Sequence, residues 1–176
     1  MKNKKTTKNI AISAVCLALC YVLPFLTANN QLLGNALCLM HLPVFLCGFI
    51  CGAPYGALVG IIAPLLRSLT LGMPPIIIAI SMAAELCVYG LASGLINSKL
   101  PRKPGFIYLS LICAMLLGRL AGGASKLVLL ALGRLESYSI GVFFSAYFIT
   151  ALPGIILQIV LVPALVMALR KTKLDA

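Results

Sequence analysis

The feature that most constrains this chain is a nearly unbroken series of apolar segments of the length that crosses a lipid bilayer. A spanning helix needs roughly 20 apolar residues, and about 17 to 25 is the usual range. No segment has the alternating polar and apolar pattern of a membrane β-barrel strand. The sequence therefore predicts an all-α integral membrane protein, a bundle of six transmembrane helices in a single membrane domain over residues 1–176. The six expected spans are residues 10–26, 37–51, 55–71, 76–96, 106–132 and 140–169.

Composition supports the same class. The chain is 62% hydrophobic and only 10% charged. A soluble domain of 176 residues has too much surface for its volume to hide so much apolar material. Segments 37–51 and 55–71 lie at the lower limit of spanning length. Segments 106–132 and 140–169 are long enough to tilt or to extend beyond the bilayer.

The basic residues predict the orientation of the chain. It carries 14 Lys and Arg against 3 Asp and Glu, for a net charge of +11. Most of these cations lie in the two termini and in the connection between the fourth and fifth segments, which six spans place on one side. Because cytoplasmic loops are enriched in Lys and Arg, we expect both termini in the cytoplasm. Since membrane topology already accounts for this positive charge, we expect no nucleic-acid partner. The basic residues expected on the cytoplasmic side are Lys2, Lys4, Lys5, Lys8, Lys99, Arg102, Lys103, Arg170, Lys171 and Lys173.

Four charged residues fall inside or near the expected spans and are candidates for function. Arg67, Arg119 and Lys126 stand against a single acid, Glu85. Unpaired charge is costly in lipid, so this surplus predicts a water-filled cavity or a bound anion. Arg67 is either a clamp for a carboxylate or a residue that snorkels to the interface. We expect Arg119 to pair with Glu85, for binding or for structure, and Lys126 either to lie at the interface or to line a cavity.

Further polar residues extend this candidate substrate site. His41, near the start of the second segment, is either a hydrogen-bonded structural residue or a ligand contact. Asn29, Asn30 and Asn35 belong to the first outer loop, which is either an ordinary polar connection or a lid that supplies amide hydrogen bonds. Tyr89 follows Glu85 by one helical turn, so the two share a face.

The residues give no reason to expect a metal site, a cofactor or an enzyme. The 7 cysteines include no Cys-x-x-Cys pair. Cys16 and Cys20, like Cys47 and Cys51, are four residues apart, which is about one helical turn, and we interpret them as small packing residues. A single His and three acids leave too few groups for acid–base catalysis.

Small residues mark two helical surfaces. Ala11, Ala14 and Ala18 form a smooth stripe on the first segment, for packing either within the chain or against a partner helix. The second and third segments meet at a Gly-Ala-Pro turn at residues 52–54, and glycines recur along both. Small residues let helices approach closely in lipid, so we expect a tight helical hairpin here.

Together these features resemble the substrate-binding S component of an energy-coupling factor (ECF) vitamin transporter. The resemblance rests on the basic N-terminus, the six segments, the polar first outer loop, the Ala14-x-x-x-Ala18 motif and the stretch 43–60. It implies a membrane subunit of a prokaryotic plasma membrane that captures a vitamin from outside. Ala14 and Ala18 would then dock on a membrane T component that works with two cytoplasmic ATPases.

The resemblance does not identify the substrate, for which the charge balance is the guide. The surplus of cations favours an anion, with pantothenate first and nicotinate or folate after it. The chain has no phosphate-binding Gly-x-x-x-x-Gly-Lys-Ser/Thr motif, so partner subunits would have to hydrolyse ATP. The alternative is a stand-alone small secondary carrier or channel for an organic anion. For a carrier, however, the sequence shows neither a repeat between its halves nor paired acids for proton coupling.

Overall fold

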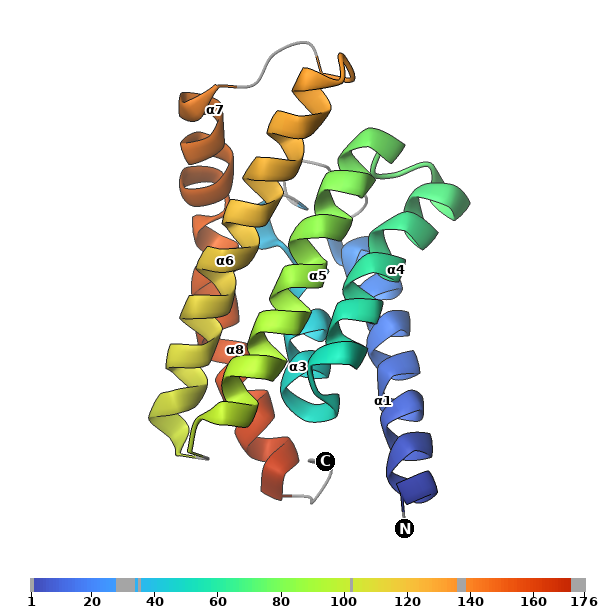
Figure 1. Cartoon of the computed structure of the whole chain (residues 1–176), viewed down its shortest axis with the longest axis vertical. Coiled ribbons are helices and arrows are strands. Elements are labelled where there is room, and N and C mark those ends of the chain that lie inside the picture. Colours follow the sequence, from blue (N-terminus) through green and yellow to red (C-terminus); the bar gives the residue numbers. More distant parts are fainter. Residues whose placement is uncertain (1, 28–33, 35, 102, 136–138, 172–176) are drawn as a thin grey trace.

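We analysed a computed structural model of the chain, which describes residues 2–27, 34, 36–101, 103–135 and 139–171. The described elements are all helical and pack side by side into a bundle (Figure 1). They confirm an all-α protein. In chain order these elements are α1 (Lys2–Val22), η1 (Leu23–Thr27), α3 (His41–Cys51), α4 (Ala53–Leu71), α5 (Ile76–Lys99), α6 (Pro104–Ala131), α7 (Ile140–Phe144), η2 (Ser145–Thr150) and α8 (Leu152–Lys171).

Within the described residues, five helical segments are long and apolar enough to cross a membrane. The first is Lys5–Leu26, which covers most of α1 and of η1. The other four are the helices α4, α5, α6 and α8. Two further apolar segments, His41–Cys51 and Ile140–Thr150, are shorter. The chain is thus a multi-pass membrane protein, but the expected count of six spans is not confirmed.

The sixth expected span, residues 140–169, is not one continuous helix. It consists of the short helix α7, the π-helical segment η2 and then α8, which begins at Leu152. Pro153 explains the break, because proline has no N–H for the helix ladder and disfavours helical geometry in the residue before it. The π-helical turn widens the backbone just before this proline.

The second expected span, residues 37–51, is corrected to the eleven-residue helix α3. At about 1.5 Å per residue its length is roughly half of a hydrocarbon core of about 30 Å. All of its residues are buried, and it packs against α1, α4, α5 and α8. Such a short helix is compatible with a membrane because protein, rather than lipid, surrounds it.

Glycines bring α3, α4 and α5 into direct backbone contact. The turn between α3 and α4 is made by Gly52, whose φ of 95° suits a residue without a side chain. A Cβ built on Gly90 would lie 2.2 Å from the carbonyl carbon of Gly56, and one on Gly60 would lie 2.4 Å from the carbonyl oxygen of Leu86. The expected close packing of the helical hairpin is therefore present, and α5 packs against the hairpin as a third helix.

The α1 helix lies at the edge of the bundle, beside α4 (Figure 1). One face of α1 carries Cys16 and Cys20 into the core. The opposite face exposes the small residues Ala11, Ala14 and Ala18. Packing within the described part of the chain therefore does not use this stripe.

Candidate functional site

The buried carboxylate of Glu85, on α5, is the centre of the polar interior. Its side chain is almost completely enclosed, with 6% of the residue exposed. The Tyr89 hydroxyl donates a hydrogen bond of 2.6 Å to Oε1 from the next turn of the helix. His41, at the start of α3, places Nε2 3.6 Å from the same oxygen. Three residues from the predicted site therefore meet at one point.

The hydrogen bonds of His41 define where its protons lie. Its Nδ1 is 3.1 Å from the backbone carbonyl oxygen of Cys38. A carbonyl only accepts hydrogen bonds, so Nδ1 carries a hydrogen. The opposite nitrogen, Nε2, faces a carboxylate favourably only when a second proton lies between them. His41 therefore links the Cys38 carbonyl to the Glu85 carboxylate, with Nε2 at ion-pair distance from Oε1.

Arg119 makes different contacts from those expected. Among the described residues it forms no ion pair with Glu85, whose Oε1 is already engaged by His41 and Tyr89. Its Nη1 instead donates to the backbone carbonyl of Tyr147 in η2. The guanidinium carbon also lies 5.3 Å from the centroid of the Phe148 ring. The expected direct ion pair is replaced by the contact with η2, and Arg119 interacts with Glu85 electrostatically without touching it.

Lys126 approaches the same segment of the chain. It follows Arg119 by two helical turns on α6, and its Nζ lies 4.5 Å from the centroid of the Tyr147 ring. A cation over an aromatic face is attracted by the negative face of the ring. Two cations from α6 therefore converge on Tyr147, one at its backbone and one at its ring.

The guanidinium of Arg119 retains unused capacity for hydrogen bonding. The residue is only 4% exposed, and its Nε has no hydrogen-bond partner among the described residues. A buried donor without an acceptor is unfavourable. An incoming carboxylate would satisfy it, because carboxylate oxygens match the planar fork of arginine.

Glycines on α6 make room for these contacts. A Cβ on Gly122 would lie 2.6 Å from the Tyr147 hydroxyl oxygen and 2.9 Å from Oε2 of Glu85. A Cβ on Gly118 would lie 2.2 Å from the Tyr89 ring. Without side chains here, the backbone of α6 can approach both tyrosines. The four-residue spacing of Gly118 and Gly122 is the sequence pattern from which this smooth face of α6 could have been predicted.

An aromatic cluster on α7 and η2 contacts this part of α6 through Phe143, Tyr147 and Phe148, while Phe144 is exposed. The rings of Phe143 and Tyr147 have centroids 5.0 Å apart, and those of Phe144 and Phe148 are 5.5 Å apart. Sequence reasoning missed this cluster, although its aromatic pairs at a spacing of four residues were visible. The cluster supplies an apolar wall beside two cations.

Arg67 belongs to a different location. Its Nη1 donates to the backbone carbonyl of Tyr21 at 2.8 Å, and its guanidinium carbon lies 5.0 Å from the centroid of the Phe25 ring. Arg67 therefore links α4 to the end of α1 and to η1. Asn29, Asn30 and Asn35 lie outside the described residues, so the lid stays a prediction.

The fold and this interior define a class, that of multi-pass helical membrane proteins with a charged, partly aromatic centre. Within that class the chain belongs to the family of ECF transporter substrate-specific components, whose family model matches residues 8–166. Comparisons with curated proteins and with solved structures gave no significant match. Members of this family are transport subunits that bind a small molecule and work with a T component and ATPase subunits.

Proposed function

We propose that this chain captures an anionic vitamin or related micronutrient, with pantothenate as the first candidate. The observation that carries the proposal is the state of Arg119, a buried cation with an unused Nε donor. Within the described residues Glu85 is the single acid, and its Oε1 lies 3.6 Å from Nε2 of His41. The positive charge of Arg119, with its unused Nε donor, therefore favours an external counter-charge.

The proposed contact is between Arg119 and a substrate carboxylate. The carboxylate accepts from Nε and from a terminal nitrogen of the guanidinium, which is the strongest geometry that arginine offers. Lys126 adds a second positive charge to the same region. The rings of Phe143 and Phe148 cover the apolar part of the substrate. Excluding water from this region strengthens each of the charged contacts.

The proposal extends to the way the subunit works in its membrane. The exposed stripe of Ala11, Ala14 and Ala18 on α1 docks on the T component, and two cytoplasmic ATPases supply the energy. The chain itself hydrolyses no ATP. Both termini lie in the cytoplasm of a prokaryotic cell, since most of the basic residues are at that end.

Calorimetry of the purified protein against the water-soluble vitamins tests the substrate class. We expect one carboxylate vitamin to bind tightly and Arg119→Gln to weaken it by about 100-fold, the equivalent of about 2.7 kcal/mol. Arg134→Gln is the matched control, because it removes the same charge from an exposed position outside the site. Tight binding of a neutral or cationic vitamin, unaffected by Arg119→Gln, would refute the anion site but not the family. Binding of no vitamin would instead favour the alternative function, a stand-alone carrier or channel for an organic anion.

A further inference from the structure

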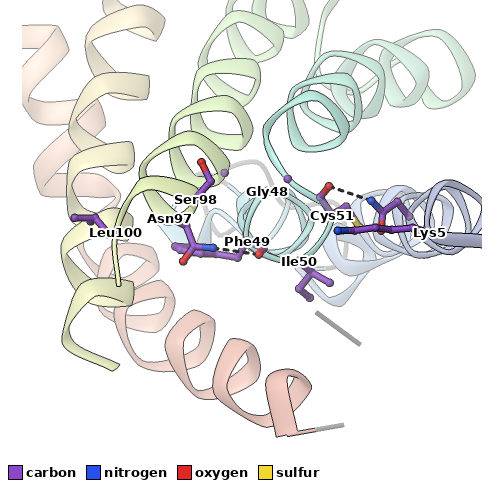
Figure 2. Close-up of a pocket in the computed structure, with 11 residues that line it drawn as sticks. Lys5, Gly48, Phe49, Ile50, Cys51, Asn97, Ser98 and Leu100 are labelled. Atoms are coloured by element: carbon purple, nitrogen blue, oxygen red, sulfur yellow. Dashed lines mark hydrogen bonds between the residues drawn. The ribbon is translucent and has the colours of Figure 1, made fainter. Parts of the chain in front are cut away.

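A polar recess lies at the end of the bundle where α1 begins and where α3 and α5 end (Figure 2). This end is opposite the aromatic cluster of α7 and η2 (Figure 1). The recess has a volume of about 290 Å³. One water occupies about 30 Å³ of liquid, and small-molecule sites begin near roughly 300 Å³. The recess is therefore too large for a single ion and large enough for a small polar group.

Asn9 gives the recess an unused hydrogen-bond acceptor. The residue lines the recess, yet only 7% of it is exposed. Its Nδ2 donates to the backbone carbonyl of Cys51 at 3.3 Å, which fixes the orientation of the amide because a carbonyl only accepts. Its Oδ1 has no hydrogen-bond partner among the described residues. A ligand with an N–H or O–H group would satisfy this atom.

The other walls of the recess carry an uneven distribution of charge. It lies at the C-terminal ends of α3 and α5, which are the negative ends of their helix dipoles and so attract donors. The Asn97 amide is already engaged, since it donates to the Phe49 carbonyl at 3.3 Å and accepts from Arg170 at 2.8 Å. Lys5 extends from α1 toward the end of α3 and adds a cation (Figure 2). The recess therefore combines the positive charge of Lys5 with acceptors for a donor group.

We propose that this recess binds the headgroup of a membrane phospholipid that carries both a phosphodiester and a hydrogen-bond donor. The phosphate pairs with Lys5, and the terminal ammonium or hydroxyl of the headgroup donates to Oδ1 of Asn9. Phosphatidylethanolamine and phosphatidylglycerol have this chemistry, whereas phosphatidylcholine has no N–H or O–H. The location supports a lipid, because the same end of the bundle exposes Lys99, Lys103 and Lys171, which are typical of the headgroup level. This inference does not depend on the identity of the transported substrate.

Native mass spectrometry of the delipidated full chain tests the proposal. The probes are dioleoyl forms of phosphatidylethanolamine, phosphatidylglycerol and phosphatidylcholine. We expect the first two to bind at least fivefold more tightly than the third. Lys5→Gln should reduce binding of both by a similar factor, while Lys103→Gln, an equal loss of charge outside the recess, should not.

Asn9→Leu tests the acceptor. It removes the amide, and we expect the preference over phosphatidylcholine to disappear. Lys5 is exposed, so Lys5→Gln remains informative even if Asn9→Leu does not fold. Equal binding of the three lipids, unchanged by Lys5→Gln, would overturn the proposal. Equally tight binding of soluble glycerol phosphate or ethanolamine phosphate would also overturn it, because the ligand would then be a free phosphate ester.

Discussion

At the scale of single residues, Gly122 decides how closely the buried polar groups approach α6. An alanine methyl group there would lie within 3 Å of oxygen atoms of both Tyr147 and Glu85. We expect Gly122→Ala to cost about 1–3 kcal/mol of stability through overpacking and to weaken ligand binding. Gly105→Ala is the control, because it makes the same change on α6 where the part of the chain that the structure describes places no neighbouring atom within 4 Å. Thermal unfolding in detergent measures both, and equal effects would contradict the assigned role of Gly122.

The contact between His41 and Glu85 makes a second prediction at this scale. His41→Gln leaves the Glu85 carboxylate buried without its ion-pair partner, which should cost about 3 kcal/mol of unfolding free energy. Adding Glu85→Gln to that variant removes the stranded charge and should recover part of the loss. Denaturation of the two variants gives the comparison. A further loss in the double variant would show that the pair is not held together by its charges.

Sequence reasoning located the charged residues but not all of their contacts. Glu85 and Tyr89 were expected to share a face because one helical turn separates them, and they do form a hydrogen bond. The contact from Arg119 to the Tyr147 carbonyl depends on how α6 packs against η2, so no spacing along the chain encodes it. Local periodicity therefore predicts neighbours on one helix and leaves partners on different helices open.

At the scale of elements, the exposed alanine stripe of α1 is the proposed docking surface. Ala14→Trp places a large ring in the exposed alanine stripe and should abolish uptake of labelled substrate by cells, while binding to the purified subunit stays unchanged. Leu120→Trp is the control, because Leu120 is exposed on α6, a different helix from the one that carries the stripe. If uptake survives Ala14→Trp, the stripe is not the docking surface.

Hydropathy predicts the positions of the helices better than it predicts the breaks between them. The runs that became α4, α5 and α6 were placed nearly at their observed limits, because long apolar stretches bounded by Gly, Pro or charge have few alternatives. The region 140–169 is continuous in hydropathy, which does not distinguish one long helix from the observed sequence of α7, η2 and α8. The composition of the eleven-residue α3 likewise predicts a membrane span, because apolarity does not distinguish a helix surrounded by protein from one surrounded by lipid.

At the scale of the whole molecule, the basic residues predict both termini in the cytoplasm. A fluorescent protein fused to the C-terminus should fold and fluoresce, because it remains inside the cell. Alkaline phosphatase fused after Arg134 should be active, because that connection is expected outside. The opposite pattern at either position would invert the orientation and place the recess near Lys5 on the outer side.

The backbone contacts among α3, α4 and α5 have a mechanical consequence. Where glycines let main chain meet main chain, no side-chain rotamers remain to absorb a displacement, so these three helices move as one stiff unit. The segments α7 and η2 instead meet α6 through rings and long side chains, which rearrange at lower cost. A ligand that arrives at Arg119 should therefore displace the η2 side of the protein while the glycine-packed side stays still. Amide hydrogen exchange would register this as slower exchange in η2 on binding, with unchanged exchange in α5.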